Sequence, residues 1–393
     1  MASAESNDGD HVVELIVRDP DTSSAAAVAD SASDEIAPLL TQAEKPKINI
    51  FTVSYPRRRP RDEVTRLLET ETSSLTQFML WVWNGSRYSG LLCMALSSII
   101  YFLMEVLSNS FSVQKIPLFE TAFTRCAIIL ILSYLWLRRS DHPIFETSNV
   151  RKILVTRALV GYLSLASFIY CIQRLPFAQA IILNLTTPIM ASVMARIFLH
   201  EKLKIADIAS LACSFFGVLF IFRKMLSEQG QLVRAEELSN ANGKRISHIF
   251  TVLLGLFSSM TGGISYCLVR AGAKASDQPL ATVFSFGLLA SPMSGICTFF
   301  FEDFVLPELQ SVLLMLLLGV LAFFAEVLLA RGLQLERTGK VANVQYMEAA
   351  LSQLWGIAFL GVAPSFGPLV GCLLIFISLS CTMYIGPDKE TEE

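Results

Sequence analysis

Residues 177–199 read FAQAIILNLTTPIMASVMARIFL and residues 340–362 read KVANVQYMEAALSQLWGIAFLGV. Each segment is apolar and long enough to cross a bilayer as a helix. Polar and small residues nevertheless recur in both at i, i+3, i+4, i+7 and i+11, which is one face of a helix. The first set comprises Asn184, Thr187, Pro188, Ala191 and Ala195, and the second, 161 positions later, comprises Gln345, Glu348, Ala349, Ser352 and Gly356. The repeated pattern predicts a membrane unit that occurs twice in the chain.

The composition of the whole chain agrees with a membrane location. The chain is 53% hydrophobic and 17% charged, which is more apolar surface than a soluble domain of this size can bury. A helix needs about 20 apolar residues to cross the hydrocarbon core of a bilayer. We therefore predict an all-α membrane protein with ten transmembrane helices, at 88–108, 117–137, 150–172, 177–199, 203–223, 247–270, 278–300, 311–333, 340–362 and 366–386.

The predicted spans divide into two halves of five. A polar linker loop at 224–246 separates a first unit at 88–223 from a second at 247–386. Because each unit has an odd number of spans, the second must enter the membrane upside down relative to the first. The sequence thus predicts two inverted five-helix repeats. Tyr101 and Tyr266 occupy similar places in the first span of each unit.

The two ends of the chain are polar. We predict a disordered tail over 1–87, in which 62–83 has the imperfect apolar stripe of a helix lying on the membrane surface. A second, short tail covers 387–393. The patterns EIAPLL at 35–40 and EVTRLL at 63–68 resemble acidic-dileucine sorting signals, so sorting adaptors are candidate partners of the N-terminal tail.

Basic residues near the span ends predict the orientation. With a cytosolic N-terminus, thirteen Lys and Arg lie on the inner side and seven on the outer side. Positive charge favours the cytosolic side, so we expect both termini in the cytosol. The organelle is left open between an endomembrane or vacuolar membrane and the plasma membrane.

Metal, cofactor and nucleic-acid sites are not indicated. The four histidines lie in loops or at span ends, and none of the eight cysteines forms a CxxC pair. No basic patch interleaved with aromatics indicates nucleic acid, and no GxxxxGK[ST] loop indicates a nucleotide-driven pump. We expect no metal and no cofactor, and the oligomeric state is not predicted.

Four ionisable residues lie deep within the predicted spans: Arg125, Arg157, Glu326 and Glu348. A charge at such depth needs either a partner or a water-filled cavity. One interpretation is a structural Arg–Glu bridge between helices, and the other is a polar cavity in which the arginines attract an anionic group. In the second interpretation Glu348 or Glu326 is the residue that carries a coupling proton.

The repeated polar face supplies the remaining candidate residues. Asn184 and Gln345 are matched amides that can both donate and accept hydrogen bonds, and Thr187 occupies the position matched by Glu348. The small residues further along each face are explained by close helix packing, and membrane-interface tyrosines are common. The predicted substrate-binding residues are Asn184, Thr187, Gln345, Glu348, Tyr101, Tyr266, Arg157 and Arg125.

Three short stretches carry a resemblance to a known family: LPFAQA at 175–180, LTTP at 185–188 and HEKL at 200–203. With them the chain resembles the drug/metabolite transporter superfamily, as a double EamA-domain protein similar to the G branch of the solute carrier 35 family. In that family a Gly usually precedes the acid, whereas here His200 precedes Glu201. The second copy has Ala349 in place of the proline and lacks the acid after Gly361.

The resemblance implies ten helices, two inverted repeats and alternating access, but it implies no particular substrate. We expect a secondary active transporter or exchanger for a small polar or anionic metabolite. One alternative is a receptor or scaffold with a transporter-like body. A membrane-embedded acyltransferase is disfavoured, because no histidine falls deep in a span and no cysteine has a base nearby in sequence. We therefore expect no enzymatic activity.

Overall fold

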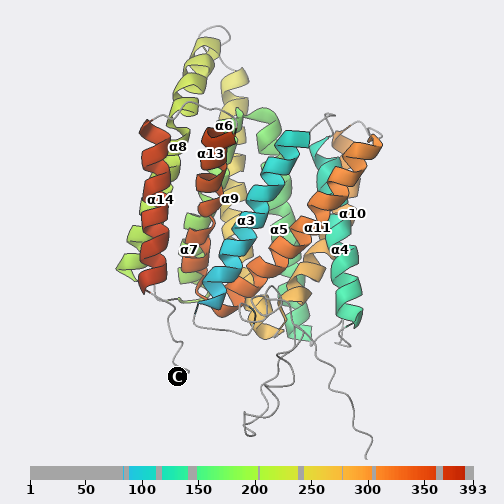
Figure 1. The fold of residues 1–393 in the computed structure, drawn as a ribbon. Coiled ribbons are helices and arrows are strands. Elements are labelled where there is room, and N and C mark those ends of the chain that lie inside the picture. The colour runs from blue at the N-terminus through green and yellow to red at the C-terminus, as the bar shows by residue number, and fades with distance from the viewer. Residues whose placement is uncertain are drawn as a thin grey trace, which may run out of the picture. The chain divides into compact units, whose positions relative to one another are not determined.

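The computed structural model describes residues 83, 88–111, 117–139, 148–201, 204–237, 243–276, 278–302, 307–359 and 366–385. All regular secondary structure within these ranges is helical (Figure 1), and the helices are apolar enough for a membrane. The predicted all-α membrane fold is thus confirmed. The predicted surface helix at 62–83, apart from Trp83, and both dileucine patterns lie outside the described residues.

The helices of the first half are α3 (Ser89–Phe111), α4 (Leu118–Arg139), α5 (Ser148–Arg174), α6 (Phe177–Asn184), α7 (Thr187–Phe198) and α8 (Ile205–Glu237). Those of the second half are α9 (Gly243–Ala275), α10 (Pro279–Phe301), α11 (Leu309–Leu335), α12 (Thr338–Val344), α13 (Met347–Phe359) and α14 (Phe366–Ile385). Within the described ranges nine segments have the length and composition of a membrane span. The predicted span at 340–362 is instead divided into α12 and α13, each of which is shorter.

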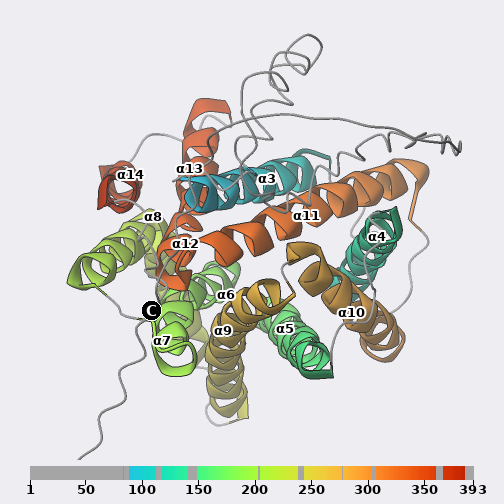
Figure 2. The ribbon, with the colours of Figure 1, turned by 90° about the horizontal axis from the view of Figure 1, so that it is seen from below.

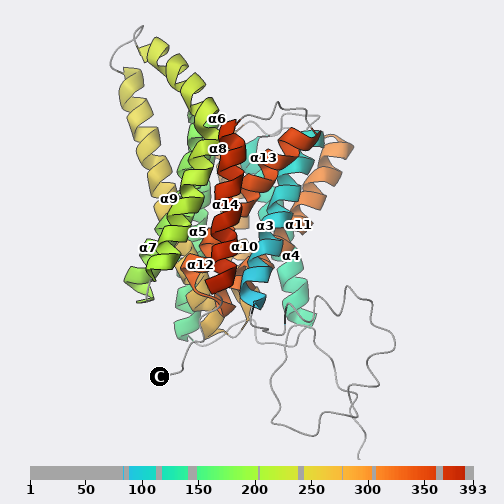
Figure 3. The same ribbon diagram turned by 60° about the vertical axis from the view of Figure 1, so that its left-hand side comes forward.

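The segment predicted as a polar linker is largely helical. α8 continues to Glu237, and α9 begins at Gly243. Both helices consequently project beyond the rest of the bundle (Figures 1 and 3).

Two predicted spans are interrupted at corresponding positions. Leu185 and Thr186 separate α6 from α7, while Gln345 and Tyr346 separate α12 from α13. Pro188 lies in the first turn of α7, where its missing N–H removes no intrahelical hydrogen bond. A continuous helix would require that bond and would bring the proline ring against the carbonyl four residues earlier, so the proline explains the first interruption.

The two interruptions contact each other. The Tyr346 hydroxyl donates a hydrogen bond to the carbonyl oxygen of Leu185 at 2.9 Å, and the two residues lie 161 positions apart in the sequence. Ser259 on α9 and Thr186 both donate to the carbonyl oxygen of Leu183. Side chains thereby satisfy the carbonyl groups that the break in the helix frees. This compensation matters because an unsatisfied backbone group costs several kcal/mol in a membrane interior.

The helix packing supports the predicted repeat. α3 packs against α11, α5 against α9, α4 against α10 and α8 against α14 (Figure 2). Exchanging the two halves converts the α3 and α11 pair into the α9 and α5 pair, and leaves the other two pairs unchanged. The inverted repeat itself stays a prediction. At the α8 and α14 crossing, a Cβ added at Gly371 would lie within 2.4 Å of the Gly217 carbonyl oxygen, so these backbones approach closely.

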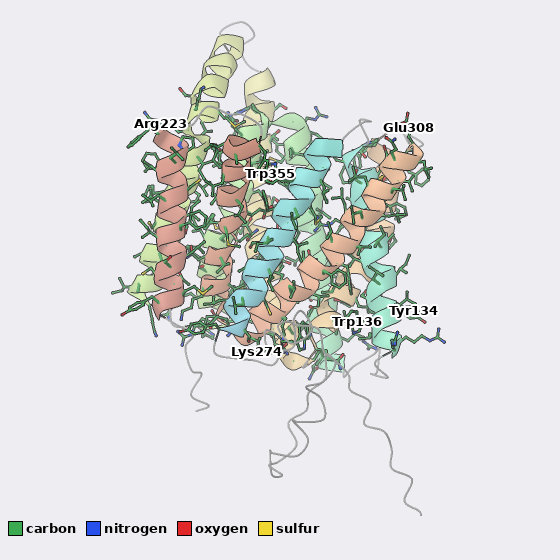
Figure 4. All side chains as sticks on the ribbon, viewed as in Figure 1. Tyr134, Trp136, Arg223, Lys274, Glu308 and Trp355 are labelled. Carbon is green, nitrogen blue, oxygen red and sulfur yellow. The ribbon has the colours of Figure 1, made fainter. Side chains whose placement is uncertain are left out.

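Charged and aromatic side chains mark the two ends of the bundle. Figure 4 shows Tyr134 and Trp136 on the lower part of α4, with Lys274 near the same end. Arg223 and Glu308 lie at the opposite end (Figure 4). The start of α3 and the end of α14 both lie at the lower end (Figure 1), which we call the α3-start end.

Candidate functional site

A cavity of about 510 Å³ lies between helices of both halves. Its volume falls in the range of roughly 300–1,000 Å³ that is usual for small-molecule sites. All nine residues that the sequence singled out for binding or coupling line this one cavity: Tyr101, Arg125, Arg157, Asn184, Thr187, Tyr266, Glu326, Gln345 and Glu348. Their convergence is a structural observation, while their roles stay predictions.

An ion cluster lies in the wall of the cavity. The Glu326 carboxylate of α11 lies 3.8 Å from Arg125 Nη2 on α4 and 3.6 Å from Arg157 Nη2 on α5. The Tyr101 hydroxyl donates to Glu326 Oε1 at 3.0 Å and accepts from Arg125 Nη2 at 3.5 Å. The Arg–Glu bridge and the polar cavity that the sequence left as alternatives are therefore present at the same place.

The two arginines of the cluster differ in exposure. The Arg157 side chain is 6% exposed, and its guanidinium carbon lies 4.6 Å from the centre of the Phe286 ring. Gly161, one turn along α5, leaves room for this group, since a Cβ there would lie 2.4 Å from Arg157 Nη1. The Arg125 side chain is 34% exposed. Arg125 is consequently the cation that the cluster presents to the cavity, whereas Arg157 is fixed in the wall.

The second half contributes a carboxylate and an amide beside its helix break. The Tyr266 hydroxyl donates to Gln345 Oε1 at 2.7 Å, which orients the amide at the end of α12. Glu348 lies in the first turn of α13 and lines the cavity. Within the part of the chain that the structure describes, its carboxylate has neither a hydrogen bond nor an ion pair.

The first half places its polar residues on either side of its own break. Asn184 is the last residue of α6, and Thr187 is the first residue of α7. Thr187 packs against α9, where a Cβ added at Gly262 would lie 3.0 Å from its methyl carbon. Both half-spans thus present polar side chains to the cavity at the points where their backbones depart from helical geometry.

A second charged cluster lies at the α3-start end of the cavity. Arg270 Nε on α9 lies 2.7 Å from Glu201 Oε1, and the two side chains are 3% and 9% exposed. Arg270 also donates to the carbonyl oxygens of Leu333, at 2.8 Å, and of Glu336. Thr338 donates to the Glu201 carboxylate through its N–H and its hydroxyl, both at 3.2 Å. We call Glu201, Arg270, Glu336 and Thr338 the end cluster.

The end cluster joins the two halves and borders the cavity. Glu201 belongs to the first half, and the other members belong to the second. Val269, which precedes Arg270, is among the residues that line the cavity. At the opposite end the lining reaches Leu118, the first residue of α4, which is 40% exposed. The sequence pointed to Glu201 only through the family resemblance and did not identify Arg270, because a charge near a span end is usually an interfacial anchor.

The comparison with protein families concerns the first half of the chain. Residues 88–223 match the EamA-like transporter family. These residues contain α3 to α7 and the membrane part of α8. They include five of the nine cavity residues, Tyr101, Arg125, Arg157, Asn184 and Thr187, and the other four lie in the second half.

Three similar proteins are transporters by name or by family. The chain is 22% identical to solute carrier family 35 member G1 of Mus musculus, over 74% of this chain and 76% of that protein. It is 26% identical to the pseudopaline exporter CntI of Pseudomonas aeruginosa, over 74% of this chain and 94% of the exporter. It is 24% identical to a riboflavin transporter of Rhizobium johnstonii, over 79% of this chain and 95% of that protein.

A solved structure agrees at the level of the fold. A crystal structure matches with a TM-score of 0.63 at 15% identity, and the match covers 76% of this chain and 99% of that chain. The resemblance to the drug/metabolite transporter superfamily that the sequence predicted is confirmed. The relatives named above are transporters, which agrees with the prediction that this chain has no enzymatic activity. The chain is thus a multi-pass membrane protein related to transporters of small molecules.

Proposed function

We propose that this protein is a secondary active transporter that moves a small polar or anionic metabolite by alternating access. The observation that carries the proposal is the convergence of nine separately predicted polar residues on one cavity between the two halves. Placing charged and amide groups within a membrane costs free energy unless they pair with another group or face a hydrated cavity. Helices that served only as a packed structural core would not need a cavity of this size lined by charged and amide groups.

The end cluster supports the alternating-access part of the proposal. It joins the two halves through the Glu201–Arg270 pair, and it adjoins the cavity lining at Val269, at the α3-start end. A movement of one half against the other would separate this pair and give the cavity access to that end. The two helix breaks, which contact each other through Tyr346 and Leu185, are natural points about which the halves move.

A carboxylate in the cavity is a candidate site for ion coupling. Glu326 is held by two arginines, whereas Glu348 is open to the cavity and can exchange a proton with water that enters it. We propose Glu348 as the first candidate for the coupling residue and Glu326 as the second. The relatives, which are named for pseudopaline and riboflavin, support a small-molecule substrate but do not favour one chemical class.

The orientation in the membrane is part of the same proposal. The start of α3 and the end of α14 lie at one end of the bundle (Figure 1), which supports termini on the same side. The excess of basic residues near the span ends at that side favours the cytosol. The N-terminal tail would then present its dileucine patterns to cytosolic sorting adaptors, in an endomembrane, a vacuolar membrane or the plasma membrane.

The experiment is uptake by the purified protein in liposomes. A panel of organic acids, amino acids, nucleosides and nucleotide sugars is offered with and without a pH gradient. We expect saturable uptake of one class that Arg125→Gln abolishes. Arg138→Gln is the matched control, because Arg138 is an exposed residue of the same helix, outside the cavity, and its loss should leave uptake unchanged. Uptake of no compound by a folded protein would instead favour the receptor or scaffold alternative.

A further inference from the structure

We propose that the transported molecule is amphoteric, with a carboxylate that Arg125 binds and an ammonium group that Glu348 binds. This inference rests on the proposed transport function and names the substrate class of the same cavity. It follows from the relative height of the two residues in the bundle, the charge balance of the cavity and the chemistry of the remaining lining.

Contacts of α3 with α12 and α13 fix the height of Glu348. Ser98 donates to the Val344 carbonyl oxygen at 3.5 Å, and Ser352 donates to Glu105 Oε1 at 3.0 Å. The residue numbers rise together in these two contacts, so α3 runs beside α12 and α13 in the same direction. Glu348 lies midway between Val344 and Ser352, which places it level with residues 101–102 of α3.

Arg125 lies at the same height. Its Nη2 is 3.5 Å from the Tyr101 hydroxyl, and its guanidinium carbon is 5.6 Å from the centre of the Tyr101 ring. Tyr101 thus stands beside Arg125 and level with Glu348, and all three residues line the cavity. One small molecule can therefore reach both the guanidinium group and the carboxylate.

The charges of the cavity leave one group of each sign available. Glu326 lies between Arg125 and Arg157, so these three residues together carry a net charge of +1. The excess positive charge is presented by Arg125, since Arg157 is buried. Glu348 is the second carboxylic acid in the lining and the group that can supply the opposite charge, and no residue in the described ranges pairs with it.

A ligand with only one charge would leave one of these groups without a partner. An anion on Arg125 would lie near the Glu348 carboxylate, and a cation on Glu348 would lie near the excess positive charge. Unpaired charge out of water is strongly unfavourable, and repulsive groups discriminate against a wrong ligand. A molecule with both a carboxylate and an ammonium group pairs with each of them.

The rest of the cavity lining indicates the chemistry of the uncharged part of the substrate. Towards the end opposite the end cluster, the wall is formed by apolar side chains of α4 and α5, among them Leu118, Leu165, Phe168, Ile169 and Ile172. Apolar surface favours an apolar or aromatic group on the same molecule. The proposed class is accordingly a small molecule with an ammonium group and a carboxylate on an apolar body.

The test compares matched compounds in liposomes that contain the full chain. Radiolabelled amino acids with apolar side chains are offered beside their amides, which lack the carboxylate, and their des-amino acids, which lack the ammonium group. We expect uptake of at least one amino acid, with uptake of its two analogues about tenfold lower or less. Uptake of the des-amino acids at an equal or higher rate would overturn the amphoteric class while leaving the transport proposal intact. Uptake of no compound, including the organic acids and nucleotides of the wider panel, would overturn the transport proposal itself.

Two variants separate recognition from a structural role. We expect Glu348→Gln to lower uptake of the amino acid about tenfold and to raise uptake of its des-amino acid, because the repulsive carboxylate is gone. Arg125→Gln should lower uptake of the amino acid and raise uptake of its amide. Equal loss of all three compounds in a folded variant would show that the residue is structural and would overturn its assignment. Asp207→Asn, at the start of α8 and outside the cavity, is the control that should change none of them.

Discussion

The substitution Arg270→Gln in the end cluster tests whether this cluster closes the cavity. It removes the cation that lies 2.7 Å from Glu201, in a place where both side chains are nearly inaccessible to water. Removal of one partner of a buried ion pair costs about 3–5 kcal/mol. Glu201 keeps its two hydrogen bonds from Thr338, so we expect the lower figure.

This cost applies to the state in which the α3-start end is closed. If Glu201 meets water in the other state, the loss of about 3 kcal/mol shifts the equilibrium towards that state by about 150-fold, at 1.4 kcal/mol for each factor of ten. The double variant Glu201→Gln with Arg270→Gln removes both charges. The cavity should be open in a smaller fraction of molecules in the double variant than in Arg270→Gln alone, since the double variant leaves no unpaired charge.

The assay measures access to the cavity from each side of the membrane. Ser265→Cys introduces a thiol on the cavity wall of α9, in a background where the exposed Cys381 and the cavity-lining Cys126 are replaced by Ser. We expect a membrane-impermeant thiol reagent added at the α3-start side to label this thiol slowly, and much faster when Arg270→Gln is present. Arg196→Gln is the control, because Arg196 is exposed and donates to the Glu201 carbonyl oxygen within the first half. Equal labelling with and without Arg270→Gln, in folded protein, would refute the closing role of the cluster.

Two further substitutions test how the cavity is built. Gly161→Ala places a Cβ 2.4 Å from Arg157 Nη1, so we expect it to displace the guanidinium group and to lower uptake. Gly295→Ala is its control, because the nearest atom to a Cβ there is a ring carbon at 3.3 Å, and uptake should be retained. Tyr346→Phe leaves the Leu185 carbonyl oxygen without its donor and should lower the free energy of unfolding by about 1–3 kcal/mol, measured by thermal unfolding in detergent. An unchanged unfolding midpoint would contradict that role of the tyrosine hydroxyl.

Much of the cavity could be predicted because polar groups are rare and costly in membrane spans. Arg125, Arg157, Glu326 and Glu348 were recognisable one by one, since each lies deep within an apolar run. The common offset of 161 positions connected Asn184 with Gln345 and Thr187 with Glu348. These two signals required no knowledge of which helices touch.

The remaining features depend on contacts between distant residues. The Glu201–Arg270 pair joins positions 69 apart, near two span ends where charged residues usually face water. Tyr346 lies next to the predicted polar face without being part of it, and only the structure places its hydroxyl against the first helix break. The helical continuation of α8 and α9 into the predicted linker was also missed, because a polar sequence between spans is compatible with either a loop or a helix.

The most direct test of the central claim is counterflow of the transported compound across liposomes. In an alternating-access transporter, unlabelled compound loaded inside should accelerate uptake of labelled compound from outside, because the loaded cavity returns faster than the empty one. We predict this acceleration in the parent protein and in Arg138→Gln, and its loss in Arg125→Gln. Uptake that does not saturate, that internal compound fails to accelerate, or that Arg125→Gln leaves unchanged would contradict transport through this cavity.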